Sequence, residues 1–108
     1  MSTSYQIILC TCPDKDSAEQ LAHLLVNEQL SACVNILPGV SSIYWWQGQS
    51  TSAQEYLLLI KAHKDHYQAI ETSIKKHHPY ELPEIIAVSI ENGLPEYLNW
   101  INSCHSHT

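Results

Sequence analysis

The order of two apolar patterns along the chain is the feature that most constrains its fold. Runs rich in bulky apolar residues, typical of strands, cover 5–11, 31–49, 53–63 and 85–90. Between them lie two segments with helical spacing: one carries an apolar stripe after Pro13 and Asp14, and the other runs from Asp65 to His78, before Pro79. The expected order is therefore strand, helix, strand, strand, helix, strand.

This order predicts an α+β fold of the ferredoxin-like, split βαβ type, with a four-stranded antiparallel sheet and helices on one face. In the first helix the pair Asp16 and Glu19 has capping-box spacing. An extra C-terminal helix is indicated by Leu94, Tyr97, Leu98 and Ile101. With 108 residues and no linker-like or repeated segment, residues 1–108 are expected to form a single domain around one core.

The stretch "IYWWQ" places Tyr44, Trp45 and Trp46 on consecutive positions of an expected strand. Consecutive strand residues point to opposite sides, so one face cannot take all three. Either both sides of this strand are covered, or the aromatic residues lie in a subunit interface, where such residues are enriched. The alternative is that two of them belong to the core and one is exposed.

The charge balance argues against several classes of partner. Eleven acidic residues face five basic ones, all lysine, and the formal net charge is −6. Such a chain repels nucleic acid and anionic lipid, so neither is expected as a partner. No secretory signal and no run of roughly 20 apolar residues is visible, which predicts a cytoplasmic protein with four reduced cysteines.

Three motifs in order resemble the CutA family of divalent-cation tolerance proteins and together cover nearly the whole chain. They are "LCTCPD", "ACVNILPGVSSIYWWQG" and "HHPYELPEIIAVSIENGLPEYLNWI". The resemblance implies a ferredoxin-like subunit in a homotrimer, whose long middle strands extend the sheet of a neighbour. It also implies copper binding, with Cys10, His77 and His78 at the positions that the family assigns to the metal, and a role in metal-ion tolerance.

The residue types of this set suit copper, because thiolates favour Cu(I) and imidazole favours Cu(II). On a regular helix, however, neighbouring side chains diverge by about 100°, so His77 and His78 can share one ion only if the helix has unwound before Pro79. The alternative is that one histidine lies at the helix C-terminus, where a positive charge is favourable, and the other packs. Cys10 equally fits a small buried strand residue.

Other cysteines and histidines are weaker candidates. Cys12 lies on the same strand face as Cys10, roughly 6.5 Å further along, and is a second choice for a shared soft site. Cys33 is expected in the core. The tail carries Cys104, His105 and His107, which are able to bind metal adventitiously and so to confuse a binding assay.

Catalysis has little support in the sequence, so the protein is expected not to be an enzyme. No glycine-flanked nucleophile or Gly-rich loop accompanies the cysteines. The carboxylates of Glu55, Glu81, Glu84 and Glu91 are expected in solvent. Two alternatives to metal binding stay open: a trimeric small-molecule sensor similar to the PII signalling proteins, and a trimeric platform for protein assembly.

Overall fold

The structure is a computed structural model that describes residues 3–104. It contains a four-stranded antiparallel sheet and three α-helices. In chain order the elements are β1 (Tyr5–Cys12), α1 (Lys15–Asn27), β2 (Cys33–Trp46), β3 (Gln49–His63), the 3-10 turn η1 (Lys64–His66), α2 (Tyr67–His77), β4 (Ile86–Ser89) and α3 (Pro95–Ser103).

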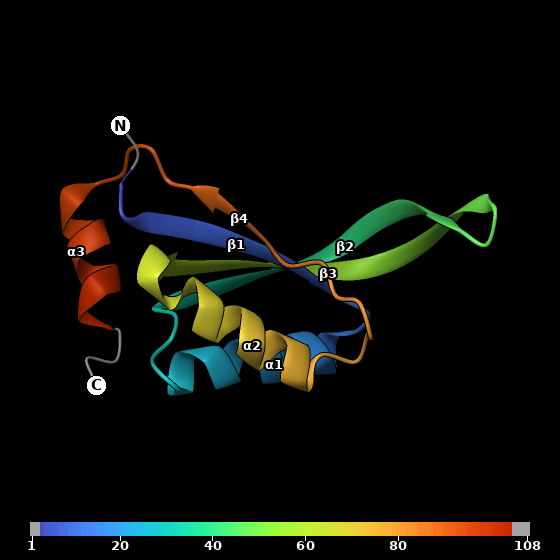
Figure 1. Cartoon of the computed structure of the whole chain (residues 1–108), viewed down its shortest axis with the longest axis horizontal. Helices are drawn as coiled ribbons and strands as arrows, with labels where there is room; N and C mark the ends of the chain where they lie inside the picture. The colour runs from blue at the N-terminus through green and yellow to red at the C-terminus, as the bar shows by residue number, and fades with distance from the viewer. Residues whose placement is uncertain (1–2, 105–108) are drawn as a thin grey trace.

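The sheet has the strand order β2-β3-β1-β4, and every neighbouring pair is antiparallel. Helices α1 and α2 lie side by side on one face, while α3 lies beside the end of the sheet where β1 begins (Figure 1). The predicted order of elements, the antiparallel sheet and the extra C-terminal helix are thus confirmed. None of the helices in the described part of the chain is long and apolar enough to span a bilayer.

Helix α1 covers the sheet with the predicted stripe, since Ala18, Leu21, Ala22 and Leu25 are all buried. The predicted capping pair is wrong. The helix is capped by Asp14, whose carboxylate accepts a hydrogen bond of 2.7 Å from the backbone N–H of Ser17. An Asp at this position satisfies one of the backbone donors that the first helical turn leaves free.

Helix α2 begins at Tyr67, two residues later than predicted, because residues 64–66 form the 3-10 turn. Its side chains Ile70 and Ile74 are fully buried against the core. His78 has already left the helix, with φ −77° and ψ 141°, as the restriction on a residue before proline requires. The unwinding that the sequence left open therefore takes place between the two histidines.

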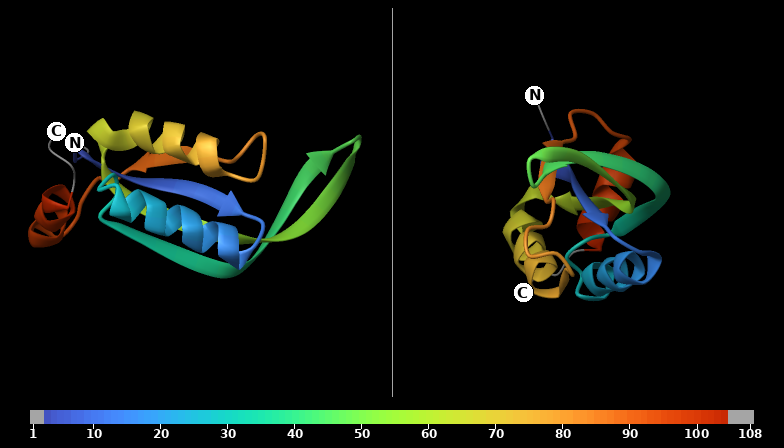
Figure 2. Two further views of the ribbon diagram at one scale, coloured as in Figure 1. Left: turned by 90° about the horizontal axis from the view of Figure 1, so that it is seen from below. Right: turned by 90° about the vertical axis from the view of Figure 1, so that its right-hand side faces the viewer.

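The β2–β3 hairpin changes character along its length. A register shift between Leu37 and Val40 interrupts the pairing, and Gly39 takes φ +71° there. Beyond the shift the hairpin leaves the rest of the molecule as a projecting ribbon, which we call the arm, residues 40–54 (Figure 2). Its two-residue turn has positive φ at both Gln47 and Gly48, the requirement of a type I′ turn.

The three aromatic residues of the arm are exposed in this chain, with 43% of Tyr44, 75% of Trp45 and 59% of Trp46 accessible. The interpretation that two of them belong to the core is therefore wrong for the single chain. The projecting ribbon extends beyond helices α1 and α2, so these helices do not cover it (Figure 2).

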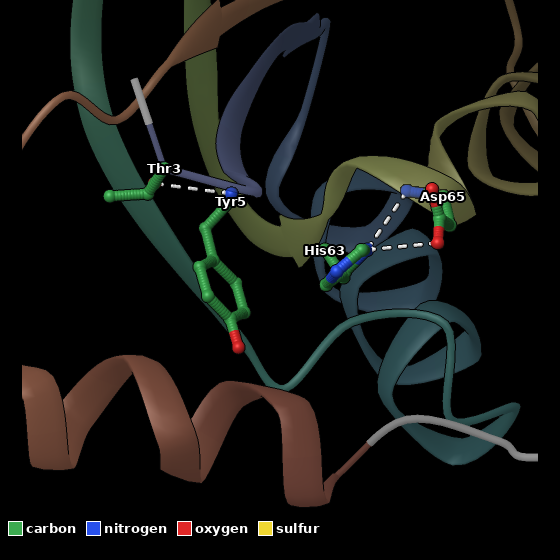
Figure 3. A network of polar contacts seen from close by, with 4 residues as sticks. All are labelled: Thr3, Tyr5, His63 and Asp65. Carbon is green, nitrogen blue, oxygen red and sulfur yellow. Dashed lines mark hydrogen bonds and ion pairs between the residues drawn. The ribbon is translucent and has the colours of Figure 1, made fainter. Parts of the chain in front are cut away.

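Polar contacts hold the opposite end of the sheet (Figure 3). The hydroxyl of Thr3 accepts a hydrogen bond from the N–H of Tyr5 at 3.2 Å. The Tyr5 ring meets His63 edge to face, with centroids 5.3 Å apart. His63 in turn accepts from the N–H of Asp65 at 3.1 Å. The ring contact joins the residues that form the first pair of the β1–β3 ladder.

Candidate metal centre

Strand β1 places two cysteines on the face that α1 and α2 cover. Cys10 and Cys12 are two residues apart, so their side chains point the same way from the strand. Both are fully buried, in a core cluster that also contains Leu21 and Ile74 of the two helices. The sequence expectation that Cys10 is a buried strand residue is confirmed, and that burial is compatible with ligation.

His78 joins the two cysteines from the end of α2. Its Nε2 lies 3.7 Å from the Cys12 Sγ and 2.8 Å from the carbonyl oxygen of Thr11. The possible ligand atoms of Cys10, Cys12 and His78 all lie within 4.8 Å of one another. Within residues 3–104 this is the one group of three or more such residues that is compact enough to hold a metal ion.

The hydrogen bonds of His78 define its tautomer. Its Nδ1 accepts from the backbone N–H of Tyr80 at 3.0 Å, so the proton of the neutral ring lies on Nε2. From there it is donated to the Thr11 carbonyl. Both ring nitrogens therefore have partners, and an ion that took Nε2 would have to displace a proton and a hydrogen bond.

Tyr80 links the group to Glu55, the first residue after the arm. Its ring lies 4.9 Å from the ring of His78, and its hydroxyl donates to the Glu55 carboxylate at 2.8 Å. Desolvation by burial, together with the hydrogen bond to Glu55, raises the pKa of Tyr80 to about 12. Only 8% of Glu55 is exposed, so the expectation that this carboxylate lies in solvent is wrong. The hydrogen bond from the Tyr80 hydroxyl offsets the cost of removing this carboxylate from water.

The two thiols differ in acidity. A hydrogen bond to Cys12, together with burial, raises the pKa of Cys10 above the ordinary thiol value. The same hydrogen bond lowers the pKa of Cys12, and the hydroxyl of Ser17 lowers it further. The two shifts have opposite directions, so the thiolate, which is the form that ligates metals, is favoured at Cys12 over Cys10.

His77 lies apart from this group. It is exposed at the last position of α2, and its Nδ1 is 2.9 Å from the carbonyl oxygen of Ser73 in the same helix. It borders a pocket whose other lining residues, Ser17 and Leu21 among them, belong to α1. The structure thus brings together Cys10 and His78 of the predicted set, while His77 occupies the helix-end position that was the predicted alternative to ligation.

Sequence reasoning underrated two members of this region. Cys12 ranked second, although the two-residue period of a strand already placed it beside Cys10. Glu55 was missed, because a carboxylate is by default exposed and its partner Tyr80 is 25 residues away. Of the tail residues only Cys104 falls within the described part; His105 and His107 lie outside it.

Comparison with known proteins supplies the family. The model of the CutA1 divalent ion tolerance protein family matches residues 6–104. A curated relative, the divalent-cation tolerance protein CutA of Yersinia pestis (strain Pestoides F), is 44% identical over 97 residues, which cover 90% of this chain and 82% of the relative.

Solved structures agree with this assignment. CutA from Xylella fastidiosa has a TM-score of 0.94 and 48% identity, covering 96% of this chain and all of that one. The periplasmic divalent cation tolerance protein CutA from Archaeoglobus fulgidus has a TM-score of 0.90 and 35% identity, covering 93% of this chain and 97% of that one. The chain therefore belongs to the CutA1 family of divalent ion tolerance proteins.

Proposed function

We propose that this protein binds copper at Cys10 and His78, acts as a homotrimer and contributes to the tolerance of metal ions. The observation that carries the proposal is the convergence of a thiol from β1 and an imidazole from the end of α2 in one buried place. His77, the third residue that the family resemblance implies, enters as a prediction to be tested with the other two.

The donor atoms of this place fit copper. Sulfur and imidazole nitrogen are soft and borderline ligands that suit Cu(I), Cu(II) and Zn, whereas Mg²⁺ and Ca²⁺ prefer several oxygen ligands. When bound, copper would be held by Cys10 and His78, and the surrounding apolar side chains would exclude water. The relatives' description as divalent-cation tolerance proteins supports a role with metal ions in general.

The homotrimer is supported by uncovered apolar side chains. Large exposed residues include Ile43, Trp45 and Trp46 on the arm, Ile86 and Val88 on β4, and Trp100 on α3. Large exposed apolar side chains are typical of surfaces that bind a partner, and edge strand β4 has a row of backbone groups that another strand can pair with. The strand order supports the ferredoxin-like classification of a single domain, in which the arm of one subunit covers the sheet of the next.

For the cellular location and the absence of enzyme activity, the proposal keeps the predictions made from the sequence. We keep the cytoplasm as the proposed location, while the Archaeoglobus fulgidus relative is described as periplasmic. The family description names tolerance of ions and no reaction, which supports a binding protein over an enzyme. The small-molecule sensor and the assembly platform remain the alternatives predicted from the sequence.

A competition titration tests the metal proposal. The full chain carries Cys104→Ser, His105→Ala and His107→Ala to remove the tail donors, and is titrated with Cu(I) and with Cu(II) against a chelator of known affinity. Light scattering first establishes that it has three times the mass of one chain. The triple variant Cys10→Ser/His77→Ala/His78→Ala is expected to lose stoichiometric binding; equal affinity in both proteins overturns the proposal.

A further inference from the structure

The identity of the third ligand can be argued from geometry. With metal–sulfur bonds of about 2.3 Å and metal–nitrogen bonds of about 2.0 Å, the sulfur and nitrogen atoms stand about 3.5 Å apart at tetrahedral angles and about 3.7 Å apart at the trigonal angles of a three-ligand site. Cys12 Sγ and His78 Nε2 are already 3.7 Å apart. The two atoms therefore have nearly the separation that a shared ion requires, and neither strand nor helix has to move.

Cys10 completes the same triangle. Its sulfur lies within 4.8 Å of both other ligand atoms, and an ordinary rotamer adjustment closes such a gap. By contrast, the His77 ring is turned back onto its own helix, at the Ser73 carbonyl. His77 would have to break that contact and cross the end of α2 to enter the group.

We propose that Cys12, rather than His77, joins Cys10 and His78 as a metal ligand, so that the centre is a dithiolate–imidazole site for a thiophilic ion, with Cu(I) as the preferred occupant. The inference deepens the proposed function and rests on it. The donor set explains the preference, because two thiolates are softer than one and favour Cu(I) over oxygen-seeking ions.

Binding conserves charge and needs no redox partner. Each thiol releases one proton to water, two sulfur–metal bonds form, and copper keeps the oxidation state +1. The product carries one net negative charge from the two thiolates and the ion. For Nε2 to bind, the hydrogen bond to the Thr11 carbonyl breaks and the ring proton moves, by exchange with water, from Nε2 to Nδ1, where it displaces the N–H of Tyr80; the imidazole stays neutral.

The three ligands are expected to contribute unequally to the Cu(I) affinity. The imidazole gives up one hydrogen bond at Nε2 and disturbs a second at Nδ1, where the N–H of Tyr80 is donated. The cysteine sulfurs each give up a proton and weak contacts, such as the 3.9 Å contact of Cys10 with the Thr11 carbonyl. Because thiolate is a softer ligand than imidazole, we expect the sulfurs to supply more of the Cu(I) affinity than the histidine.

The test compares Cys12→Ser with His77→Ala as matched single variants. Both are made in the full chain that lacks the tail donors and are titrated with Cu(I) and a competing chelator under a reductant and without oxygen. Cys12→Ser is expected to weaken Cu(I) binding by at least about tenfold and to reduce the near-ultraviolet sulfur-to-copper charge-transfer absorption, whereas His77→Ala changes neither. Circular dichroism establishes folding, and Cys12→Ala replaces the serine variant if serine does not fold.

Two results overturn the inference in different ways. If Cys10→Ser and His78→Ala weaken binding but Cys12→Ser does not, the proposed function stands and Cys12 is not a ligand. If none of the three weakens binding, the proposed function fails and the inference fails with it. Loss of binding in His77→Ala with retention in Cys12→Ser restores the ligand set implied by the family resemblance.

Discussion

The two halves of the β2–β3 hairpin have the same secondary structure and opposite surroundings. In the half that pairs with β1, Leu58 and Ile60 are fully buried beneath α1 and α2. In the arm, beyond the register shift, Ile43 is 77% exposed and Trp45 75% exposed. Both halves carry large apolar side chains, so the presence of such side chains alone does not decide which half is covered within the chain.

The difference teaches where the two halves obtain their stability. The packed half gains the burial of its side chains against helices of the same chain, so its contribution is independent of protein concentration. The arm has no such cover and, in the proposed trimer, gains it from a neighbouring subunit. The candidate metal centre lies at the junction of the halves, where Tyr80 and Glu55 meet beside His78.

The largest expected effect is in the packed half. Leu58→Ala removes a fully buried side chain opposite Cys10 and leaves a cavity, which costs about 3 kcal/mol of unfolding free energy. Urea unfolding should show this loss at every protein concentration. A cost below about 1 kcal/mol would mean that the packed half is not the stable part of the hairpin.

The next effect is in the arm. Trp45→Ser should weaken subunit association by at least about tenfold, because large aromatic residues dominate interface energies. Sedimentation equilibrium measures the change, and Ser50→Ala, at the cross-strand partner of Trp45, is the matched control. If the tryptophan variant associates as strongly as the control, the arm is not part of the interface.

A smaller effect is expected at the junction. Tyr80→Phe leaves the buried Glu55 carboxylate without its phenol donor and should cost about 1–2 kcal/mol of unfolding free energy. Tyr67→Phe is the control, since it removes a similar tyrosine–glutamate bond in α2, to Glu71, whose carboxylate is less buried than that of Glu55. If urea unfolding gave the same loss of unfolding free energy for both variants, the burial of Glu55 would make no difference to the strength of the Tyr80 hydrogen bond.

The smallest effect is a dependence on alkaline pH. The folded-state pKa of Tyr80 is raised to about 12 from an unfolded value of 10.0. A raised pKa means that the folded state holds the proton more tightly, so the contribution of Tyr80 is complete below pH 10 and is lost as pH rises towards 12. The stability difference between wild type and Tyr80→Phe should therefore shrink between these pH values. A difference that stays constant across them would contradict the raised pKa.

Sequence periodicity predicted the elements well because the patterns are local. The stripe of α1 and the strand pattern of β1 each depend on neighbours a few residues away, and both are found in the structure. The different positions of the His77 and His78 rings were harder to predict. It depends on the residue at which α2 ends, and one residue's change of ψ sends the two rings to different partners.

Non-local contacts account for what the sequence did not predict. The burial of Glu55 depends on Tyr80, which a turn after α2 brings back to β3. The exposure of the arm depends on the register shift between Leu37 and Val40 and on the twist of the hairpin. Neither leaves a mark in the pattern of apolar residues, so the sequence did not predict this exposure. Cys12 was predictable from the sequence as a neighbour of Cys10. His77 was nevertheless predicted as the third ligand, because the family resemblance implied it.

The central claim is that the protein holds copper through sulfur at the buried junction of the hairpin. X-ray absorption of the Cu(I)-loaded full chain, with the tail donors replaced, tests it most directly, because the spectrum distinguishes sulfur from nitrogen and oxygen neighbours of the ion. The account predicts two sulfur ligands and one nitrogen ligand, with one sulfur lost in Cys12→Ser. A first shell of nitrogen and oxygen alone would contradict it.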